Sequence, residues 1–337
     1  MKRAIMVVLK ILLLFCVVGF VLYALGPKVA VPELDKTLPE VTSNLVQLEE
    51  EITVGEANNL NVKEDNQARI VWADSTKQKT PFSIVYLHGW SASQEEGNPL
   101  HEETAKRYGY NLYLPRLAGH GLKEPFAMKG LTATQLIASA KKAIAIGKQL
   151  GDKVLLMATS TGGTLGMYLA TDDKDIAGLI LYSPNVEIYD KSAFLLSKPW
   201  GLALFKIING SPFYQTKNAS EKEQQYWSTK YHGEALTHLQ ALLDVTMKDA
   251  IFKAITQPVF LGYYYKNSEE QDRVVSVPAM LRMYDALGTE PNQKRKEAFK
   301  NVASHVLPSY LFSKDIDAVR KNTFSFLEDV LGWIPRN

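Results

Sequence analysis

From about residue 69 to the C-terminus, short runs of β-branched and aromatic residues alternate with stretches in which apolar residues recur at helical spacing. This alternation is typical of an α/β fold, in which a mostly parallel sheet is flanked by crossover helices. The runs predict strands over residues 70–73, 83–87, 111–114, 153–159, 178–182, 259–264 and about 299–303. Helices are predicted over 132–151, directly after residue 160, and over 315–331. The first carries a Thr132-x-x-Gln135 capping box and a terminal glycine.

One long interval, residues 185–256, breaks this alternation because no strand is evident in it. We interpret it as a helical insertion in the α/β unit. It is rich in large apolar side chains, namely Phe194, Leu195, Leu196, Trp200, Phe205, Phe213, Tyr214 and Trp227. Each of them is more typical of a core than of a ligand contact, but as a set they favour an apolar pocket.

The N-terminus carries a long apolar segment, residues 4–25, interrupted only by Lys10. The uninterrupted part, residues 11–25, reaches about 22 Å as a helix, short of the ~30 Å hydrocarbon core of a bilayer. Residues 4–9 supply the missing length if Lys10 extends its charge toward the near interface. A membrane-spanning helix is therefore predicted.

A cleaved signal peptide is the alternative for this segment, because a basic start and about 15 apolar residues also fit that pattern. The best cleavage site, Ala24-Leu25-Gly26, is followed by Pro27, which disfavours cleavage. Basic residues precede the segment and acidic residues follow it, so the positive-inside rule predicts a cytoplasmic N-terminus. The folded part would then face the periplasm or the cell exterior, and it would be secreted if the segment were removed.

Overall charge and cysteine content narrow the range of expected functions. The 337 residues include 38 basic and 36 acidic side chains, a net charge of +2, which gives no electrostatic reason to expect nucleic-acid binding. The only cysteine, Cys16, lies in the apolar N-terminal segment, so the folded part has neither a disulfide nor a thiol nucleophile. No motif implies a metal or an organic cofactor, and the histidine spacing suggests no zinc cluster.

The strongest chemical signal is the sequence V-L-L-M-A-T-S-T-G-G-T at residues 154–164, where a buried-strand pattern runs into Ser160. A sharp turn between strand and helix exposes a serine hydroxyl and needs small residues on both sides. Ala158, Gly162 and Gly163 provide them. The usual pattern is G-x-S-x-G, and here alanine replaces the first glycine. A simple helix cap or a phosphate loop would also fit this segment alone.

A second signal is I-V-Y-L-H-G-W at residues 84–90, where a strand ends at His88-Gly89. The glycine allows the following loop to fold over the serine, so the backbone N–H groups of Trp90 and Thr161 are predicted to form an oxyanion hole. His88 itself is predicted to be structural and to hydrogen-bond its own loop.

Two further candidates lie downstream, in the order acid then histidine. Asp272 follows the predicted strand at 259–264, and His305 follows the last predicted strand. Catalytic groups of open α/β sheets gather at the carboxyl ends of the strands, so Ser160, Asp272 and His305 are expected to converge. The order Ser, Asp, His agrees with a nucleophile, an orienting acid and a base.

Other polar residues compete for these roles, and we interpret them as structural or solvated. Glu269 and Glu270 are expected to be solvated loop charges, and Asp285 to lie in a helix. Glu95 and Glu96 could meet a polar substrate group, but a solvated turn is the favoured interpretation. The remaining histidines are expected either to stabilise a loop near the site mouth, as for His120, or to be surface or helix residues, as for His101, His232 and His238.

In these motifs the chain resembles the α/β-hydrolase family, especially its monoacylglycerol lipase-like and serine aminopeptidase-like branch. The resemblance covers about residues 69–332 through L-H-G-W, L-P-R-L-A-G-H-G at 114–121, A-T-S-T-G-G, D-R-V-V and S-H-V-L. It implies an α/β-hydrolase fold in which the insertion at about 185–256 is a cap that selects the substrate. Alanine at position 158 is the one departure from the family pattern.

The predicted organisation is an anchor or signal segment at 1–26, a tether without chemistry and a first strand region at 27–66, and a hydrolase domain at 67–337. The predicted function is that of a membrane-anchored serine hydrolase that cleaves small acyl esters or lipids through an acyl-enzyme. A serine peptidase or amide hydrolase is one alternative, because the same three residues serve both bonds. A non-catalytic binding protein that keeps the fold is the other.

Overall fold

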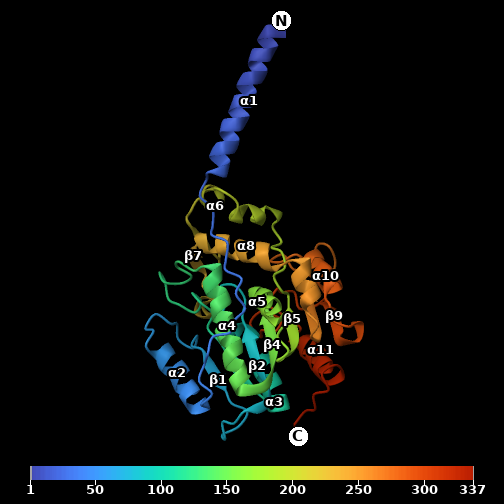
Figure 1. The fold of residues 1–337 in the computed structure, drawn as a ribbon. Coiled ribbons are helices and arrows are strands. Elements are labelled where there is room, and N and C mark those ends of the chain that lie inside the picture. Colours follow the sequence, from blue (N-terminus) through green and yellow to red (C-terminus); the bar gives the residue numbers. More distant parts are fainter. Residues whose placement is uncertain (1, 337) are drawn as a thin grey trace.

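The computed structural model describes residues 2–336, and its centre is a seven-stranded sheet with the order β1-β3-β2-β4-β5-β8-β9 (Figure 1). Neighbouring strands are parallel except β1, which runs antiparallel to β3. The strands are β1 (Arg69–Val71), β2 (Thr80–Leu87), β3 (Asn111–Leu114), β4 (Gly151–Thr159), β5 (Ile176–Tyr182), β8 (Val259–Tyr264) and β9 (Lys294–Phe299). The predicted α/β class with a mostly parallel sheet is confirmed.

The prediction of the last strand is wrong in position. It was placed at about residues 299–303, whereas β9 spans Lys294–Phe299. This strand lies at the edge of the sheet and pairs only with β8. Its sequence is K-R-K-E-A-F, and only Phe299 is buried. Edge strands commonly carry charge, which discourages pairing with other chains, so no apolar run marks this strand.

Helices cover both faces of the sheet and enclose two hydrophobic cores. One core packs α4 (Ala133–Leu150), α5 (Thr161–Ala170) and α10 (Val277–Ala286) on one face, and the other packs α3 (Leu100–Tyr108) and α11 (Ile316–Asp329) on the opposite face. Successive side chains of β2 point to opposite faces of the sheet and so contribute to both cores. Val85 and Leu87 belong to the first core, and Ile84 and Tyr86 belong to the second. The predicted helices are confirmed, and Thr132 and Gln135 form the predicted capping box at the start of α4.

The segment before the sheet, predicted as a tether and first strand region, is partly helical. It contains a helix, α2 (Leu45–Ala57), whose first N–H groups are capped by the side chain of Asn44. Leu48 of α2 is buried in the first core, and Glu56 forms an ion pair with Arg116, 2.7 Å between Oε2 and Nε. Only one face of this short helix touches the core, which leaves a weak hydrophobic pattern. Helix α2 therefore packs against the folded unit.

The N-terminal helix α1 (Lys2–Ala24) projects from the body as a single rod (Figure 1). Its residues Ile5–Ala24 are long and apolar enough to cross a membrane, with a mean hydropathy of 3.0, and none of that window is buried against the rest of the chain.

The insertion at residues 185–256 is mainly helical, as predicted, but it also holds a two-stranded antiparallel sheet that the sequence did not reveal. Its strands are only three residues long, and β6 pairs with β7 through Phe213↔His232, Tyr214↔Tyr231 and Gln215↔Lys230. The insertion contains η2 (Lys191–Ser197), α6 (Gly201–Asn209), β6 (Phe213–Gln215), α7 (Glu221–Tyr226), β7 (Lys230–His232), α8 (Glu234–Thr246) and α9 (Asp249–Ala254). We call this insertion the cap region.

Candidate active site

Ser160 occupies a sharp turn between β4 and α5. Its backbone has φ 53° and ψ −119°, a region that L-residues rarely adopt, and this strain is typical of a serine lifted out between a strand and a helix. The turn requires close packing, because a Cβ on Gly162 would lie 1.9 Å from the carbonyl oxygen of Leu87. A Cβ on Gly163 would lie 2.8 Å from the ring of Pro184. Only glycine fits at either position without displacement.

Asp272 and His305 are joined by a hydrogen bond of 2.7 Å between Oδ2 and Nδ1. Asp272 lies in the loop after β8, as predicted, and its other oxygen accepts the N–H groups of Val274 and Val275 at 2.9 and 3.1 Å. Its side chain is fully buried, so the position of the carboxylate is fixed from both sides. This arrangement places the Nδ1 proton of His305 toward Asp272 and leaves Nε2 as the free acceptor.

Electrostatics favour an ionised pair at this hydrogen bond. Burial alone would lower the pKa of His305, but the charge and hydrogen bond of Asp272, with a further contribution from Glu96, hold it above its usual range. Burial alone would raise the pKa of Asp272, but His305 and the two backbone N–H groups lower it. Asp272 is thus the carboxylate and His305 the group that titrates.

Ser160, Asp272 and His305 follow the carboxyl ends of β4, β8 and β9, three adjacent or nearby parallel strands of the sheet. Ser160 is only 4% exposed and the side chain of His305 only 13%, so this structure holds the site nearly closed. No hydrogen bond joins the Ser160 hydroxyl to His305 among residues 2–336. In resting enzymes such contacts are often long and tighten when substrate binds.

The two predicted oxyanion donors belong to segments next to this turn, because a Cβ on Gly89 would lie 3.1 Å from Cβ of Ser160. Thr161 is the first residue of α5, so its N–H is one of the helix N-terminal groups that lack a partner within the helix. Trp90 follows Gly89 at the end of β2, and its indole donates a 3.0 Å hydrogen bond to the hydroxyl of Tyr231 in β7. This contact fixes the Trp90 side chain against the cap region.

His88 and His120 are structural, as predicted from the sequence. The Nε2 atom of His88 accepts the N–H of Leu117, while its Nδ1 contacts the carbonyl of Gly89. Burial lowers the pKa of His88 to about 3 and that of His120 to about 4, so both are neutral near pH 7. His120 bonds to the carbonyl of Ala118 and holds its loop beside Trp90, with ring centroids 5.7 Å apart.

The rival acids are surface side chains, and Glu270 and Asp285 accept hydrogen bonds from Lys266 and Lys296. Glu269 and Glu270 are exposed, and Asp285 is an exposed residue of α10, as predicted. His101 is a helix residue of α3, as predicted, although it is buried and its Nε2 contacts the Gln94 carbonyl, whereas His232 lies on strand β7 rather than in a helix. No group of three or more His, Cys, Asp and Glu side chains within residues 2–336 is arranged to hold a metal ion.

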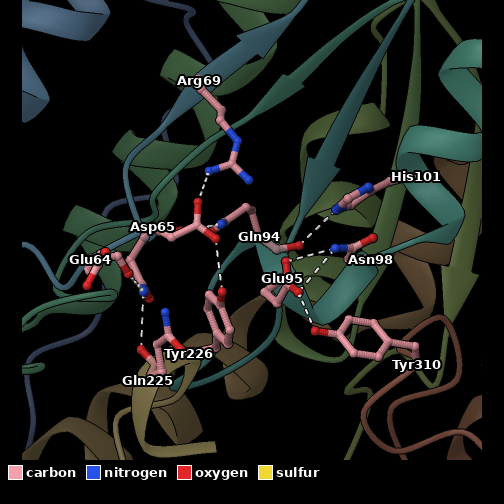
Figure 2. Close-up of polar contacts among 11 residues, drawn as sticks. Glu64, Asp65, Arg69, Gln94, Glu95, Asn98, His101, Gln225, Tyr226 and Tyr310 are labelled. Carbon is pink, nitrogen blue, oxygen red and sulfur yellow. Dashed lines mark hydrogen bonds and ion pairs between the residues drawn. The ribbon is translucent and has the colours of Figure 1, made fainter. Parts of the chain in front are cut away.

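The predicted solvated turn at Glu95 and Glu96 is wrong, because both side chains are buried in the short helix η1 (Gln94–Gly97). Figure 2 shows Glu95 facing Asn98 and Tyr310, and the Tyr310 hydroxyl donates to Oε1 at 3.0 Å. The Oε2 atom of Glu96 instead accepts the N–H of Gly89 at 2.6 Å, next to the serine turn. Adjacent charged residues ordinarily indicate solvent, and only the tertiary contacts reveal their burial.

The geometry and the comparisons with known proteins agree on the family. Residues 84–309 match the model of the alpha/beta hydrolase family, which is more than half of the chain. The chain therefore belongs to the alpha/beta hydrolase family. Its match to the thermostable monoacylglycerol lipase of Bacillus sp. (strain H-257) is 33% identical over 108 residues. That match covers 32% of this chain and 42% of the lipase, less than half the length of either protein.

Solved structures share the fold at low sequence identity. One, from a study of two metagenome-derived lipolytic enzymes named LipS and LipT, has a TM-score of 0.63 and 17% identity, covering 79% of this chain and 99% of that one. A soluble variant of monoglyceride lipase from Saccharomyces cerevisiae has a TM-score of 0.58 and 11% identity, covering 90% and 98%. Est1E of Butyrivibrio proteoclasticus has a TM-score of 0.55 and 14% identity, covering 81% and 98%.

Proposed function

We propose that this protein is a serine hydrolase that cleaves carboxylic esters, with Ser160 as nucleophile, His305 as base and Asp272 as the residue that orients the base. The observation that carries the proposal is the 2.7 Å hydrogen bond between Asp272 and His305. Both residues follow the carboxyl ends of strands, as does the strained turn at Ser160. The lipases and the lipolytic enzyme among the similar proteins support ester hydrolysis as the reaction.

In the proposed reaction, the Ser160 hydroxyl turns toward Nε2 of His305 and attacks the acyl carbonyl while the imidazole takes its proton. The carbonyl oxygen becomes an oxyanion held by the N–H groups of Trp90 and Thr161. His305 then protonates the leaving alcohol as the ester bond breaks, which leaves the acyl group on Ser160. Water, deprotonated by the same histidine, attacks the acyl-enzyme, and His305 returns that proton to the Ser160 oxygen as the acid is released. Asp272 stabilises the imidazolium in both steps.

The cap region is proposed to bind the acyl chain. Tyr231 of β7 reaches Trp90 at the predicted oxyanion hole, so cap residues and site residues are in direct contact. The backbone N–H of Ser228 also donates to the carbonyl of Ser91 at 2.7 Å. A small ester or an acyl lipid with an apolar chain is the substrate class that this setting favours.

We also propose that α1 is a single-pass membrane anchor with the catalytic domain on the outer side. The end of α1 meets the cap region at Trp200, whose indole donates to the Leu22 carbonyl at 3.1 Å and whose backbone N–H donates to Pro27 at 2.8 Å. Trp200 is 45% exposed, and the neighbouring Ile207 and Ile208 of α6 are 78% and 75% exposed. An exposed tryptophan beside an apolar helix end is typical of a membrane interface.

Matched ester and amide substrates test the reaction. Purified protein would be assayed on p-nitrophenyl esters and on the corresponding anilides over a graded series of acyl lengths, with Ser160→Ala as control. We expect ester turnover that disappears in Ser160→Ala and little amide turnover. Faster anilide cleavage would favour the amide hydrolase, and no turnover with a folded protein would favour the non-catalytic binding protein.

Membrane placement is tested separately with C-terminal reporters. A reporter active only outside the cytoplasm should give signal in the membrane fraction, and the fusion should keep the mass of the uncleaved chain. Signal from a cytoplasm-only reporter would contradict the orientation, and recovery in the medium at a smaller mass would identify a cleaved signal peptide.

A further inference from the structure

Glu96 is a buried carboxyl group at the active site that the proposed triad does not use. It lies in η1, its residue is 2% exposed, and Oε2 accepts two hydrogen bonds, from the N–H of Gly89 at 2.6 Å and from the Tyr86 hydroxyl at 3.2 Å. Tyr86 in turn is 2.9 Å from the hydroxyl of Thr159, the residue before Ser160. One carboxyl group thus links the loop after β2 to the end of β4.

Glu96 also lies against the nucleophile. A Cβ on Gly89 would be 2.7 Å from Oε1 of Glu96 and 3.1 Å from Cβ of Ser160, so the carboxylate and the serine face the same side of that glycine. The Gly89 amide is fully engaged by Glu96, which leaves the next N–H along the chain, that of Trp90, to meet an oxyanion. Glu96 therefore fixes the His88–Gly89 peptide, which is adjacent to the Gly89–Trp90 peptide that carries a predicted oxyanion donor.

The helix that carries Glu96 is held rigidly by its neighbours (Figure 2). The side chain of Gln94 donates to the Asp65 carbonyl at 2.5 Å, and the Gln94 carbonyl contacts His101 at 2.9 Å. Glu95 is bound by Asn98 and by Tyr310. A carboxyl group on such a fixed segment cannot move to solvent when it ionises, so its charge acts on the site.

We propose that Glu96 is a positioning residue for the hydrolytic reaction: its carboxylate fixes the His88–Gly89 peptide, and thereby the backbone next to the Trp90 N–H, for oxyanion binding, and it stabilises the protonated form of His305. This proposal rests on the proposed function and deepens it. The first role acts through the hydrogen bond to Gly89, and the second acts through the mutual attraction of the two charged side chains.

Among the titratable groups around Glu96, only His305 is expected to change its charge near neutral pH. Burial lowers the pKa of His88, at the end of β2, to about 3 and that of His101, in α3, to about 4. Burial raises the pKa of Tyr86 well above its usual range, so these three groups stay neutral. Asp272, which is hydrogen-bonded to Nδ1 of His305, has a lowered pKa and stays ionised.

Glu96 and His305 therefore titrate as a coupled pair. Burial raises the pKa of Glu96 to about 7, while the Gly89 N–H and His305 oppose that shift. The carboxylate in turn contributes to the raised pKa of His305. Removing the negative charge at position 96 lowers the pKa of His305, so the base is neutral, and active, at lower pH.

The test compares the pH profiles of kcat/KM for wild type, Glu96→Gln and Glu95→Gln. Glutamine keeps an oxygen acceptor for Gly89 but removes the charge, and Glu95 is the matched control because its carboxylate bonds to Asn98 and Tyr310 instead. We expect the acid limb of Glu96→Gln to move to lower pH by roughly half to one unit, with Glu95→Gln unchanged. An unmoved limb in a folded Glu96→Gln would overturn the role of the charge.

A third variant tests the alignment. Glu96→Ala lacks the acceptor for Gly89, and we expect kcat to fall at least about tenfold with KM little changed, in line with a weakened oxyanion contact. An unchanged kcat would overturn that role. If neither variant folds, the pH profile of wild-type kcat/KM is the test. Two coupled ionisations make the acid limb broader than the limb of a single ionisation. A limb with the width of a single ionisation would contradict the proposal. Inactive wild type would instead refute the proposed function itself.

Discussion

The carboxylate of Asp272 lies 2.7 Å from Nδ1 of His305 although the two residues are 33 positions apart in the chain. Two backbone N–H groups, from Val274 and Val275, hold the other carboxylate oxygen. The imidazole is thereby kept in one orientation and one tautomer, with Nε2 available at the sheet edge that carries Ser160. The predictions below follow from this relationship and from the packing around it.

Replacing Asp272 by asparagine tests the orienting role. The amide would favour the wrong tautomer of His305 while keeping the volume of the side chain, so kcat should fall by about 10⁴ with the fold intact. Glu270→Gln is the control, because Glu270 is an exposed residue of the same loop and should leave kcat unchanged. Near-normal turnover in Asp272→Asn would show that another acid orients the base.

The pH dependence of ester cleavage should show an acid limb with a midpoint above 6.5, the usual pKa of histidine. A protonated His305 cannot accept the serine proton, and Asp272 with Glu96 holds the pKa of His305 above that value. Asp272 stays ionised throughout because its own pKa is lowered. Steady-state kcat/KM from pH 5 to 9 measures the limb, and a midpoint at 6 or below would be at odds with the charge arrangement.

The glycine after Thr161 should tolerate no side chain. In Gly162→Ala the new methyl would overlap the Leu87 carbonyl, 1.9 Å away, so the variant should lose at least about 1–3 kcal/mol of unfolding free energy together with activity. Gly166→Ala is the control, because the nearest atoms to its Cβ are side-chain carbons at 3.7 Å and alanine favours a helix by up to ~1 kcal/mol. Urea denaturation of both variants checks the contrast.

Two N-terminal truncations test whether residues 27–66 belong to the folded unit. Removing residues 1–26 should leave the unfolding free energy of the remaining chain little changed. Removing residues 1–66 also deletes the buried side chains of Leu48 and Val62 and the Glu56–Arg116 ion pair, so a loss of about 3 kcal/mol or more is expected. Equal stability of the two truncated proteins would mean that this segment is only a tether.

Much of the fold could be predicted because its signals are local. Central strands such as β4 and β8 are buried on both faces and appear as continuous apolar runs. The start of α4 is marked by the capping box of Thr132 and Gln135. The serine turn is also local, since its small residues are sequence neighbours. The convergence of Asp272 with His305 was inferred from the rule that catalytic groups gather at strand carboxyl ends, and the structure brings those two together.

The remaining features depend on contacts that a single sequence does not display. The edge strand β9 is charged because one side lacks a neighbouring strand, and the short strands β6 and β7 are stabilised mainly by each other. Glu96 looked like a solvated residue because its partners, Gly89 and Tyr86, come from a different element. Burial of a carboxyl group depends on tertiary contacts, so the pattern of apolar and polar residues along the sequence does not predict it.

Covalent labelling with a fluorophosphonate probe, mapped by mass spectrometry of the digested protein, tests the proposed nucleophile most directly. One adduct on the peptide that contains Ser160 is predicted, with labelling abolished in Ser160→Ala and strongly slowed in His305→Gln. An adduct on a different residue, or ester turnover that persists in a folded Ser160→Ala protein, would contradict the account.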